Sequence, residues 1–307
     1  MSQTMLQLVQ QVTAELNLAV PTYVAGNTSQ DVQQVLALMN ASGYELVKEH
    51  DWQALELEYR FYTDAVTFVG DTVGTSSYNI IVTGDATALN SDYSIQGTGI
   101  NQDTYVSSVT YNSGTGKSTI VTSQLSSGTY TGVTFTFSQT KYDLPPDFET
   151  MTDRTHWDKT KHWEMLGPED AQQWQWLKSG YISTGPRIRW RILDNQFQVW
   201  PPMNTNEYIG WEYKSKGYVR GADGSVKTSF TADSDTTVLD DRTIVLFTKM
   251  KYWGIKGFDT TVVSQDYQRV LSIAKAQDKG APNLSFAPYP SKVLIGYANI
   301  PDTGYGS

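Results

Sequence analysis

The side chains best suited to metal binding are the three histidines, His50, His156 and His162. His156 and His162 lie near Asp158 and Glu164, so nitrogen and carboxylate ligands occur close together in the sequence. A spacing of six residues does not bring two ligands to one face of a helix, and the His-Glu-x-x-His pattern of zinc proteases is absent. We therefore expect a packed, tryptophan-rich loop here and no bound metal.

One segment partly matches a phosphate-binding loop. Residues Gly114–Thr119 read Gly-Thr-Gly-Lys-Ser-Thr, but the first glycine of that motif would fall at the position of Tyr111. The motif also requires a following helix, whereas the residues from Thr119 to Thr122 favour a strand. A glycine-rich turn of a β-hairpin explains this segment better than phosphate binding does.

Two pairs of carboxylates could bind calcium or act in acid–base catalysis. Asp233 and Asp235 resemble the start of a calcium-binding loop, but the glycine and closing glutamate of an EF-hand are missing. Turn formation and capping before a helix at Asp240 explain them better. Asp147 and Glu149 could form an acid–base pair, although sequence spacing does not define the carboxylate separation that glycoside hydrolysis requires. No Gly-x-Ser-x-Gly motif is present, and we predict neither catalytic residues nor a cofactor.

Four tryptophans lie within twenty positions of one another: Trp157, Trp163, Trp174 and Trp176. The first explanation is burial in the core of their own domain. The second is an anchoring role in a protein interface, because Trp is enriched in interface hot spots. Stacking on sugars is the third.

Hydrophobic periodicity predicts helices at both ends of the chain. Apolar residues recur at helical spacing until Pro21 ends the run. A second helix is predicted after Ser29, which is suited to the N-cap position. Asp240 is expected to cap a long helix, and another helix is predicted over about Thr261–Asp278.

Strands and a short helix are predicted between these ends. Alternation of apolar and polar residues predicts strands at Leu55–Tyr62, Arg187–Ile192, Gln196–Trp200 and Tyr208–Tyr213. An extended segment is expected at Tyr142–Phe148, and Pro168 is expected to be the first residue of a helix.

The composition changes at about Asp64. Ser, Thr and Gly make up roughly half of residues 66–139, as in many flexible linkers. However, β-branched and aromatic residues alternate regularly there, and glycine-rich turns separate the runs at intervals of roughly ten residues. We therefore predict an all-β domain, a sandwich or barrel, inserted into a helical domain.

Charge and composition exclude several classes of protein. The formal net charge of -9 argues against wrapping of a nucleic-acid backbone, which needs clustered Lys and Arg. There is no cysteine, so neither disulfides nor thiolate sites are possible. The first 20 residues lack the basic start of a signal peptide, and no apolar run reaches the roughly 18 residues of a membrane span. We expect no contact with a membrane.

Two separated blocks of sequence resemble the head–tail adaptor proteins of tailed bacteriophages, particularly short-tailed ones. The first block comprises Pro21–Asn40 and Gly43–Trp52. The second comprises Tyr142–Phe148, Trp157–Thr160, Gly167–Pro168, Trp174–Lys178, Pro201, Trp211–Tyr213, Phe230–Thr236 and Trp253–Phe258. The resemblance covers residues 1–63 and 140–285, and none of its motifs is catalytic.

The resemblance implies a structural protein and not an enzyme. Such adaptors form a ring, usually of twelve copies, between the portal protein and the tail nozzle or tail tube protein, and DNA passes through it without specific binding. The protein is then made in the host cytoplasm and resides in the virion, at the head–tail junction. Terminal segments of adaptors commonly reach into the portal or the nozzle. Here the expected portal-facing residues are Tyr289, Leu294, Ile295, Tyr297, Ile300 and Tyr305.

The sequence thus predicts an α+β fold: a helical-bundle adaptor core with a small β element, plus the inserted all-β domain. The core comprises residues 1–63 and 141–279, the insertion 64–140, and an extended arm 280–307. The turn at Ile95–Ile100 resembles small β-modules inserted in phage and bacterial surface proteins, which implies a decoration that touches capsid, fibres or host glycans. The alternatives are a glycan-binding virion module and a polysaccharide-degrading tail enzyme.

Overall fold

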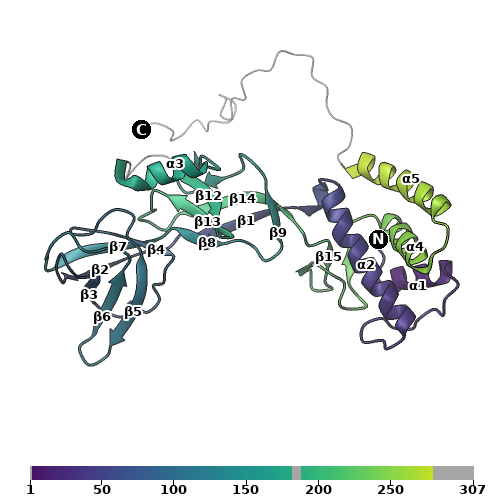
Figure 1. The fold of residues 1–307 in the computed structure, drawn as a ribbon, viewed down its shortest axis with the longest axis horizontal. Coiled ribbons are helices and arrows are strands. Elements are labelled where there is room, and N and C mark those ends of the chain that lie inside the picture. Colours follow the sequence, from purple (N-terminus) through teal and green to yellow (C-terminus); the bar gives the residue numbers. More distant parts are fainter. Residues whose placement is uncertain (1, 182–187, 279–307) are drawn as a thin grey trace, which may run out of the picture.

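The computed structural model describes residues 2–181 and 188–278. In Figure 1 the molecule is elongated, with helices at one end, antiparallel sheets in the middle and a separate β-structure at the other end. The six arm residues for which portal binding is expected lie outside the described residues, so their role stays a prediction. No helix in the described part of the chain is both long and apolar enough to cross a membrane.

Four helices from the two ends of the chain pack into one helical unit. They are α1 (Met5–Glu15), α2 (Gln30–Glu49), α4 (Asp241–Lys256) and α5 (Thr261–Asp278). Their apolar faces share one hydrophobic cluster, in which Leu8 of α1, Met39 of α2 and Ile244 of α4 are fully buried. The cluster also takes in Val219 of a small three-stranded sheet, made of β15 (Val219–Arg220), β16 (Val226–Lys227) and β17 (Thr236–Thr237).

Local sequence signals fix where these helices begin. Thr4 and Gln7 form a capping box at α1, with each side chain bonded to the backbone N–H of the other residue. The carboxylate of Asp240 accepts a 2.8 Å hydrogen bond from the Thr243 N–H, so the predicted cap of α4 is confirmed. Ser29 occupies the N-cap position of α2 without a side-chain capping bond.

The middle of the molecule consists of two antiparallel sheets that share one aromatic core. The larger sheet contains β1 (Glu56–Tyr62), β14 (Tyr208–Ser215), β10 (Trp157–Asp158), β11 (Trp163–Glu164) and β9 (Phe148–Met151); the smaller contains β8 (Lys141–Asp143), β12 (Arg189–Leu193) and β13 (Gln196–Trp200). The 3-10 helix Gln53–Leu55 leads from the helical unit into β1. The core between these central sheets holds Trp190, Phe197 and Trp211.

A short helical segment packs beside the smaller sheet (Figure 1). It consists of α3 (Ala171–Trp176), which continues into the π-helical turn Leu177–Tyr181. The helix begins after Asp170, whose carboxylate accepts a 2.7 Å bond from the Gln173 N–H. The prediction that Pro168 is the first helical residue is therefore wrong, because Asp170 supplies the capping group and the helix begins at Ala171.

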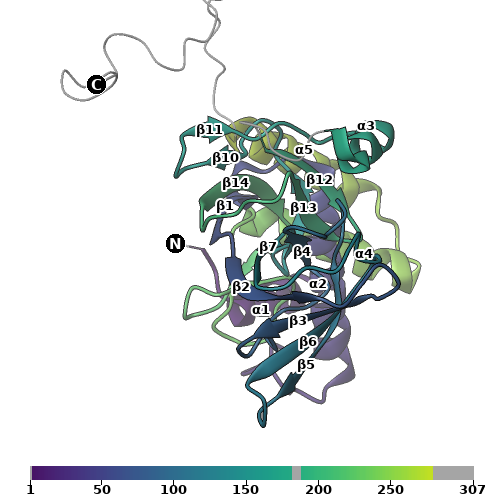
Figure 2. The same ribbon diagram turned by 90° about the vertical axis from the view of Figure 1, so that its left-hand side faces the viewer.

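The third part is a six-stranded antiparallel sheet that curves into a half-barrel. Its strands are β2 (Ala65–Thr72), β3 (Asn79–Thr83), β4 (Tyr93–Gln96), β5 (Val106–Asn112), β6 (Lys117–Thr122) and β7 (Val133–Gln139), in the order β4-β7-β2-β3-β6-β5. An isolated bridge from Ser94 to Tyr105 brings the two edges of the sheet together. Figure 2 shows this half-barrel in front of the rest of the molecule. Its strands fall within the insertion predicted at 64–140, whose boundaries stay a prediction.

The predicted helical-bundle core is wrong. Strands and turns occupy most of the chain between residues 56 and 237, and only five α-helices, all short, occur in the described residues. The strands expected as a small β element pair across long sequence distances, for example β1 with β14, and so create a core of their own. Periodicity reveals a strand but not its partners, and we therefore underestimated the extent of sheet.

Candidate functional site

The histidines considered as metal ligands do not come together. His156 is fully buried, with its ring stacked on Trp190 at a centroid distance of 3.8 Å. Burial lowers the pKa of His156 to about 3, so the ring is neutral at physiological pH. His162 lies on the surface in a turn of left-handed backbone. Within residues 2–181 and 188–278, no group of three His, Asp or Glu side chains is arranged to hold a metal.

The segment that resembles a phosphate loop is the turn between β5 and β6. The Gly116 N–H donates to the Asn112 carbonyl, and β6 then pairs with β5 in antiparallel register. The prediction of a glycine-rich hairpin turn is therefore confirmed.

The two pairs of carboxylates also have structural partners. Asp233 accepts bonds from the backbone of the loop before α2, and Asp235 forms an ion pair with Lys227. Asp147 accepts bonds from hydroxyl groups of β14, whereas Glu149 lies 3.6 Å from Lys48 on α2. Asp147 and Glu149 thus serve different contacts and do not form an acid–base pair.

The four clustered tryptophans divide between core and surface. Trp174 is buried with Leu177 and Trp200 in a small cluster of its own, as the core explanation expects. Trp163 and Trp176 are exposed, and Trp157 is half-buried. Burial therefore accounts fully for only one of the four rings.

Several hydrogen bonds fix the half-barrel on the central sheets. Thr63, just before β2, donates its N–H to the Glu207 carbonyl at 2.9 Å and accepts the Glu207 N–H at its hydroxyl at 2.8 Å. Where the chain leaves the half-barrel again, the Ser138 hydroxyl donates to the Asn204 side chain at 2.9 Å. The entry to the half-barrel and the exit from it are thus both bonded to the segment 204–207. The half-barrel therefore has a defined orientation on the central sheets.

A buried pair of carboxyl groups lies at the segment 204–207, where the half-barrel is bonded to the central sheets. Asp158 and Glu207 are close enough to share a proton. Burial, together with a hydrogen bond to Glu207, raises the pKa of Asp158 to about 6. Burial also opposes ionisation of Glu207, but bonds from Asp158 and Lys161 outweigh it and lower the pKa of Glu207. The second carboxylate oxygen of Glu207 is buried without another partner among the described residues, so below about pH 6 a protonated Asp158 can donate a hydrogen bond to it.

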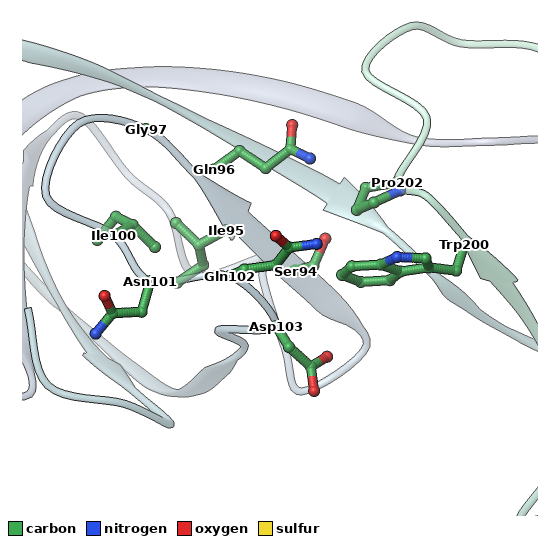
Figure 3. Close-up of a pocket in the computed structure, with 10 residues that line it drawn as sticks. All are labelled: Ser94, Ile95, Gln96, Gly97, Ile100, Asn101, Gln102, Asp103, Trp200 and Pro202. Carbon is green, nitrogen blue, oxygen red and sulfur yellow. The ribbon is translucent and has the colours of Figure 1, made fainter. Parts of the chain in front are cut away.

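A pocket of about 420 Å³ opens where the half-barrel meets the smaller central sheet. Figure 3 shows its two sides: β4 and the turn that follows it contribute one, while Trp200 and Pro202 contribute the other. The lining residues are Ser94, Ile95, Gln96, Gly97, Ile100, Asn101, Gln102, Asp103, Trp200 and Pro202.

An ion pair anchors the side of the pocket near Asp103. The Lys178 ammonium lies 3.0 Å from the Asp103 carboxylate, and 5.0 Å and 5.7 Å from the ring centres of Tyr105 and Trp200. The indole N–H of Trp200 donates to the Leu177 carbonyl at 3.1 Å. These contacts hold the Trp200 ring in place, and the positive charge of Lys178 is neutralised by Asp103. The described lining residues therefore offer amide, hydroxyl and apolar contacts, and the nearby Lys178 is already paired with Asp103.

Sequence reasoning found only one side of this pocket. The turn Ile95–Ile100 was noted as a decorating element, whereas Asp103, Trp200 and Pro202 were not singled out. About 100 residues separate the two sides, and no local pattern reports a contact over that distance. No protein-family model matches this chain and no curated protein is significantly similar to it, so the pocket is interpreted from its own geometry.

Proposed function

We propose that this chain is a head–tail adaptor of a tailed bacteriophage, a structural protein that forms a ring between the portal and the tail nozzle. The observation that supports this proposal is the packing of the resembling residues at the two ends of the chain. Although more than 150 residues separate α2 from α4, the two helices share a single hydrophobic cluster with α1 and α5. Val35 of the first block and Phe230 of the second therefore belong to one folded unit, whereas Tyr142 and Trp211 of the second block belong to the core of the central sheets.

An exposed apolar patch supports contact with a second copy. Ile255 and Phe258, at the end of α4, are each 61% exposed, and Val262, at the start of α5, is 66% exposed. Neighbouring exposed apolar side chains are typical of interaction sites. In a ring, each copy contacts the next through two different surfaces, so such a patch faces another part of its neighbour.

The fixed half-barrel also fits a structural role. Bonds where the chain enters and leaves it orient it on the central sheets, as described above for Thr63 and Ser138. A module held in this way projects at the same angle from every copy of a ring. This geometry supports a regular decoration at the neck of the virion.

Electron microscopy of virions tests the proposal. Virions of the phage that encodes this chain are labelled with an antibody fragment against the half-barrel. We expect label at the neck, between head and tail. Label at fibre tips or at the far end of the tail, or no label on intact and opened virions, would contradict the adaptor proposal.

Two variants of the full chain test which surfaces carry the assembly. Phe258→Ser with Val262→Ser changes only exposed side chains, so we expect a folded protein that no longer forms rings on the portal. A chain that ends at Lys279 lacks the expected portal-facing arm, and we expect it to fold but to lose portal binding. Sedimentation with purified portal measures both, and normal co-sedimentation of either variant refutes the role assigned to that surface.

A further inference from the structure

We propose that the pocket between the half-barrel and the smaller central sheet binds one uncharged saccharide unit. The pocket is lined by both polar and apolar groups, as a sugar has both hydroxyl and C–H groups, and its volume of about 420 Å³ lies in the usual range of small-molecule sites. This site goes beyond the adaptor function and does not depend on it.

The polar side of the pocket suits hydroxyl groups. The lining includes Gln96, Asn101 and Gln102, and a carboxamide both donates and accepts hydrogen bonds, as a sugar hydroxyl does. The amide of Asn101 already donates to the Leu125 carbonyl at 2.9 Å. Among the described residues, the Gln96 side chain makes no hydrogen bond of its own. In Figure 3 this side chain extends across the pocket toward Pro202. Gln96 is therefore the residue that a ligand would engage most directly.

The apolar side suits the C–H groups of a sugar ring. Ile95, Ile100 and Pro202 line the pocket beside the Trp200 ring. Trp200 is only 2% exposed, so very little of its ring is open for stacking. A nucleobase would need an open aromatic face on which to stack, and this pocket does not supply one.

The charges favour a neutral ligand. The ten described lining residues include one carboxylate, Asp103, and no lysine or arginine. Asp103 forms its ion pair with Lys178, whose side chain is 14% exposed. An anionic sugar would place a second negative charge beside Asp103, and none of the described lining residues carries a positive charge to compensate it.

The site is also rigid before a ligand arrives. A Cβ at Gly97 would lie 2.8 Å from the Phe135 ring and 3.0 Å from the Thr134 carbonyl, so the turn after β4 packs directly on β7. On the other side, the Leu177 carbonyl holds the Trp200 indole. Binding therefore requires little ordering of the walls, which favours affinity.

Saturation-transfer NMR on the full chain tests this inference. The probes are glucose, galactose, N-acetylglucosamine, cellobiose, lactose and N,N′-diacetylchitobiose. We expect at least one to bind, and Gln96→Ala to weaken that binding about fivefold to tenfold because one hydrogen bond is lost. Gln96→Trp should fill the pocket and abolish binding. Gln268→Ala, on the exposed face of α5, is the matched control and should bind normally.

Three outcomes would overturn the inference. The first is that none of the six sugars binds. The second is that Gln96→Trp binds as the unaltered chain does, which places the sugar elsewhere. The third is that Gln268→Ala weakens binding as much as Gln96→Ala. Because every measurement uses the isolated chain, failure here leaves the adaptor proposal intact, and mislocated label on virions leaves the saccharide site intact.

Discussion

The half-barrel and the central sheets are both built from antiparallel strands, but different side chains fill their interiors. In the half-barrel, aliphatic residues such as Ile80 and Ile120 pack around Phe135 and Phe137. Most of its buried hydroxyls have acceptors: Thr72 donates to the Gly128 carbonyl at 2.8 Å, for example, and among the described residues only Ser126 has no partner. Ser118 and Thr122 likewise donate to backbone carbonyls.

The core of the central sheets is aromatic and leaves polar atoms without partners. His156 is enclosed by Trp190, Phe197 and Trp211. Among the described residues, both ring nitrogens of His156 and the indole nitrogens of Trp190 and Trp211 have no hydrogen-bond partner. Each such buried group reduces stability by about 1–3 kcal/mol.

The difference shows two ways to fill a sheet interior. Small hydroxyl side chains of the half-barrel bond to nearby backbone carbonyls, so a Ser/Thr-rich sequence can still form a core in which most polar groups have partners. The large rings of the central sheets gain buried area and stacking, but the indole N–H groups of Trp190 and Trp211 find no acceptor among the described residues. Substitutions should therefore increase stability more easily in the core of the central sheets than in the half-barrel.

The largest expected effect comes from a matched pair of truncations. Phe135→Ala and Phe197→Ala each remove a fully buried ring, one from each core, and each should lower the free energy of unfolding by about 3–5 kcal/mol. The half-barrel, residues 65–139, contains no tryptophan. We expect Phe197→Ala to shift the transition followed by tryptophan fluorescence, and Phe135→Ala to act mainly on amide exchange in β6 and β7. Equal fluorescence shifts would mean that the two cores unfold together.

The next effect concerns the buried histidine. Because the pKa of His156 is about 3 in the fold and 6.5 in its ordinary state, stability is lost as pH falls from about 6.5 toward 3. His156→Phe removes this loss. The variant should gain about 2 kcal/mol more at pH 5 than at pH 7.5, measured by urea unfolding. His162→Asn, at an exposed turn, is the control, and an equal gain at both pH values would contradict the prediction.

A smaller effect of pH on stability, opposite in sign, is expected from Asp158. Because the pKa of Asp158 is raised from 3.8 to about 6, its protonated form stabilises the fold, and stability is lost as pH rises from about 4 to 6. In Asp158→Asn the amide can donate to Glu207 at every pH while its oxygen keeps the Thr160 and Lys161 N–H bonds. We expect this variant to be more stable than the unaltered chain by about 1 kcal/mol at pH 7.5.

Thermal unfolding at several pH values checks this prediction. The advantage of Asp158→Asn should vanish near pH 4, where Asp158 itself is protonated. Asp153→Asn, on the surface nearby, is the control. A variant that is less stable at pH 7.5 and equally so at pH 4 would show that the two carboxyl groups do not share a proton.

The smallest effect is expected from the ion pair beside the pocket. Lys178→Gln removes the contacts with Asp103, Tyr105 and Trp200, but because Asp103 is partly exposed, the loss of stability should stay below about 1 kcal/mol. Amide exchange should accelerate in residues 101–105 and remain unchanged in β2 and β7. Lys256→Gln, which removes an exposed contact with Tyr252, is the control. Uniform acceleration through the half-barrel would contradict a local role for Lys178.

Much of the local structure followed from sequence, but the balance between helix and sheet did not. The strand predicted at Leu55–Tyr62 is β1, and the helix predicted after Asp240 is α4. Both are set by side-chain period and capping, which act within a few residues. The helical-bundle core was wrong because β1 pairs with β14, more than 140 residues away, and periodicity contains no information on pairing.

The pocket shows the same limit at the level of a site. Its turn, Ile95–Ile100, stood out in the sequence because it contains Gly97 and Gly99. Gln96 lies in that turn, but nothing local indicates that it faces Pro202. The carboxylate pair of Asp158 and Glu207 was likewise hidden, since Asp158 lies in β10 and Glu207 precedes β14, almost 50 residues later.

The sequence by itself determined the helix caps, the alternation of the strands, the hairpin turn after β5 and the acidic charge of the chain. These features depend on neighbours a few residues apart or on composition alone. Only the tertiary structure decided that β1 pairs with β14, that an aromatic core encloses His156, and that a pocket opens beside Trp200. These features require segments far apart in the chain to meet, and the free energy that brings them together comes from burial of non-local surface.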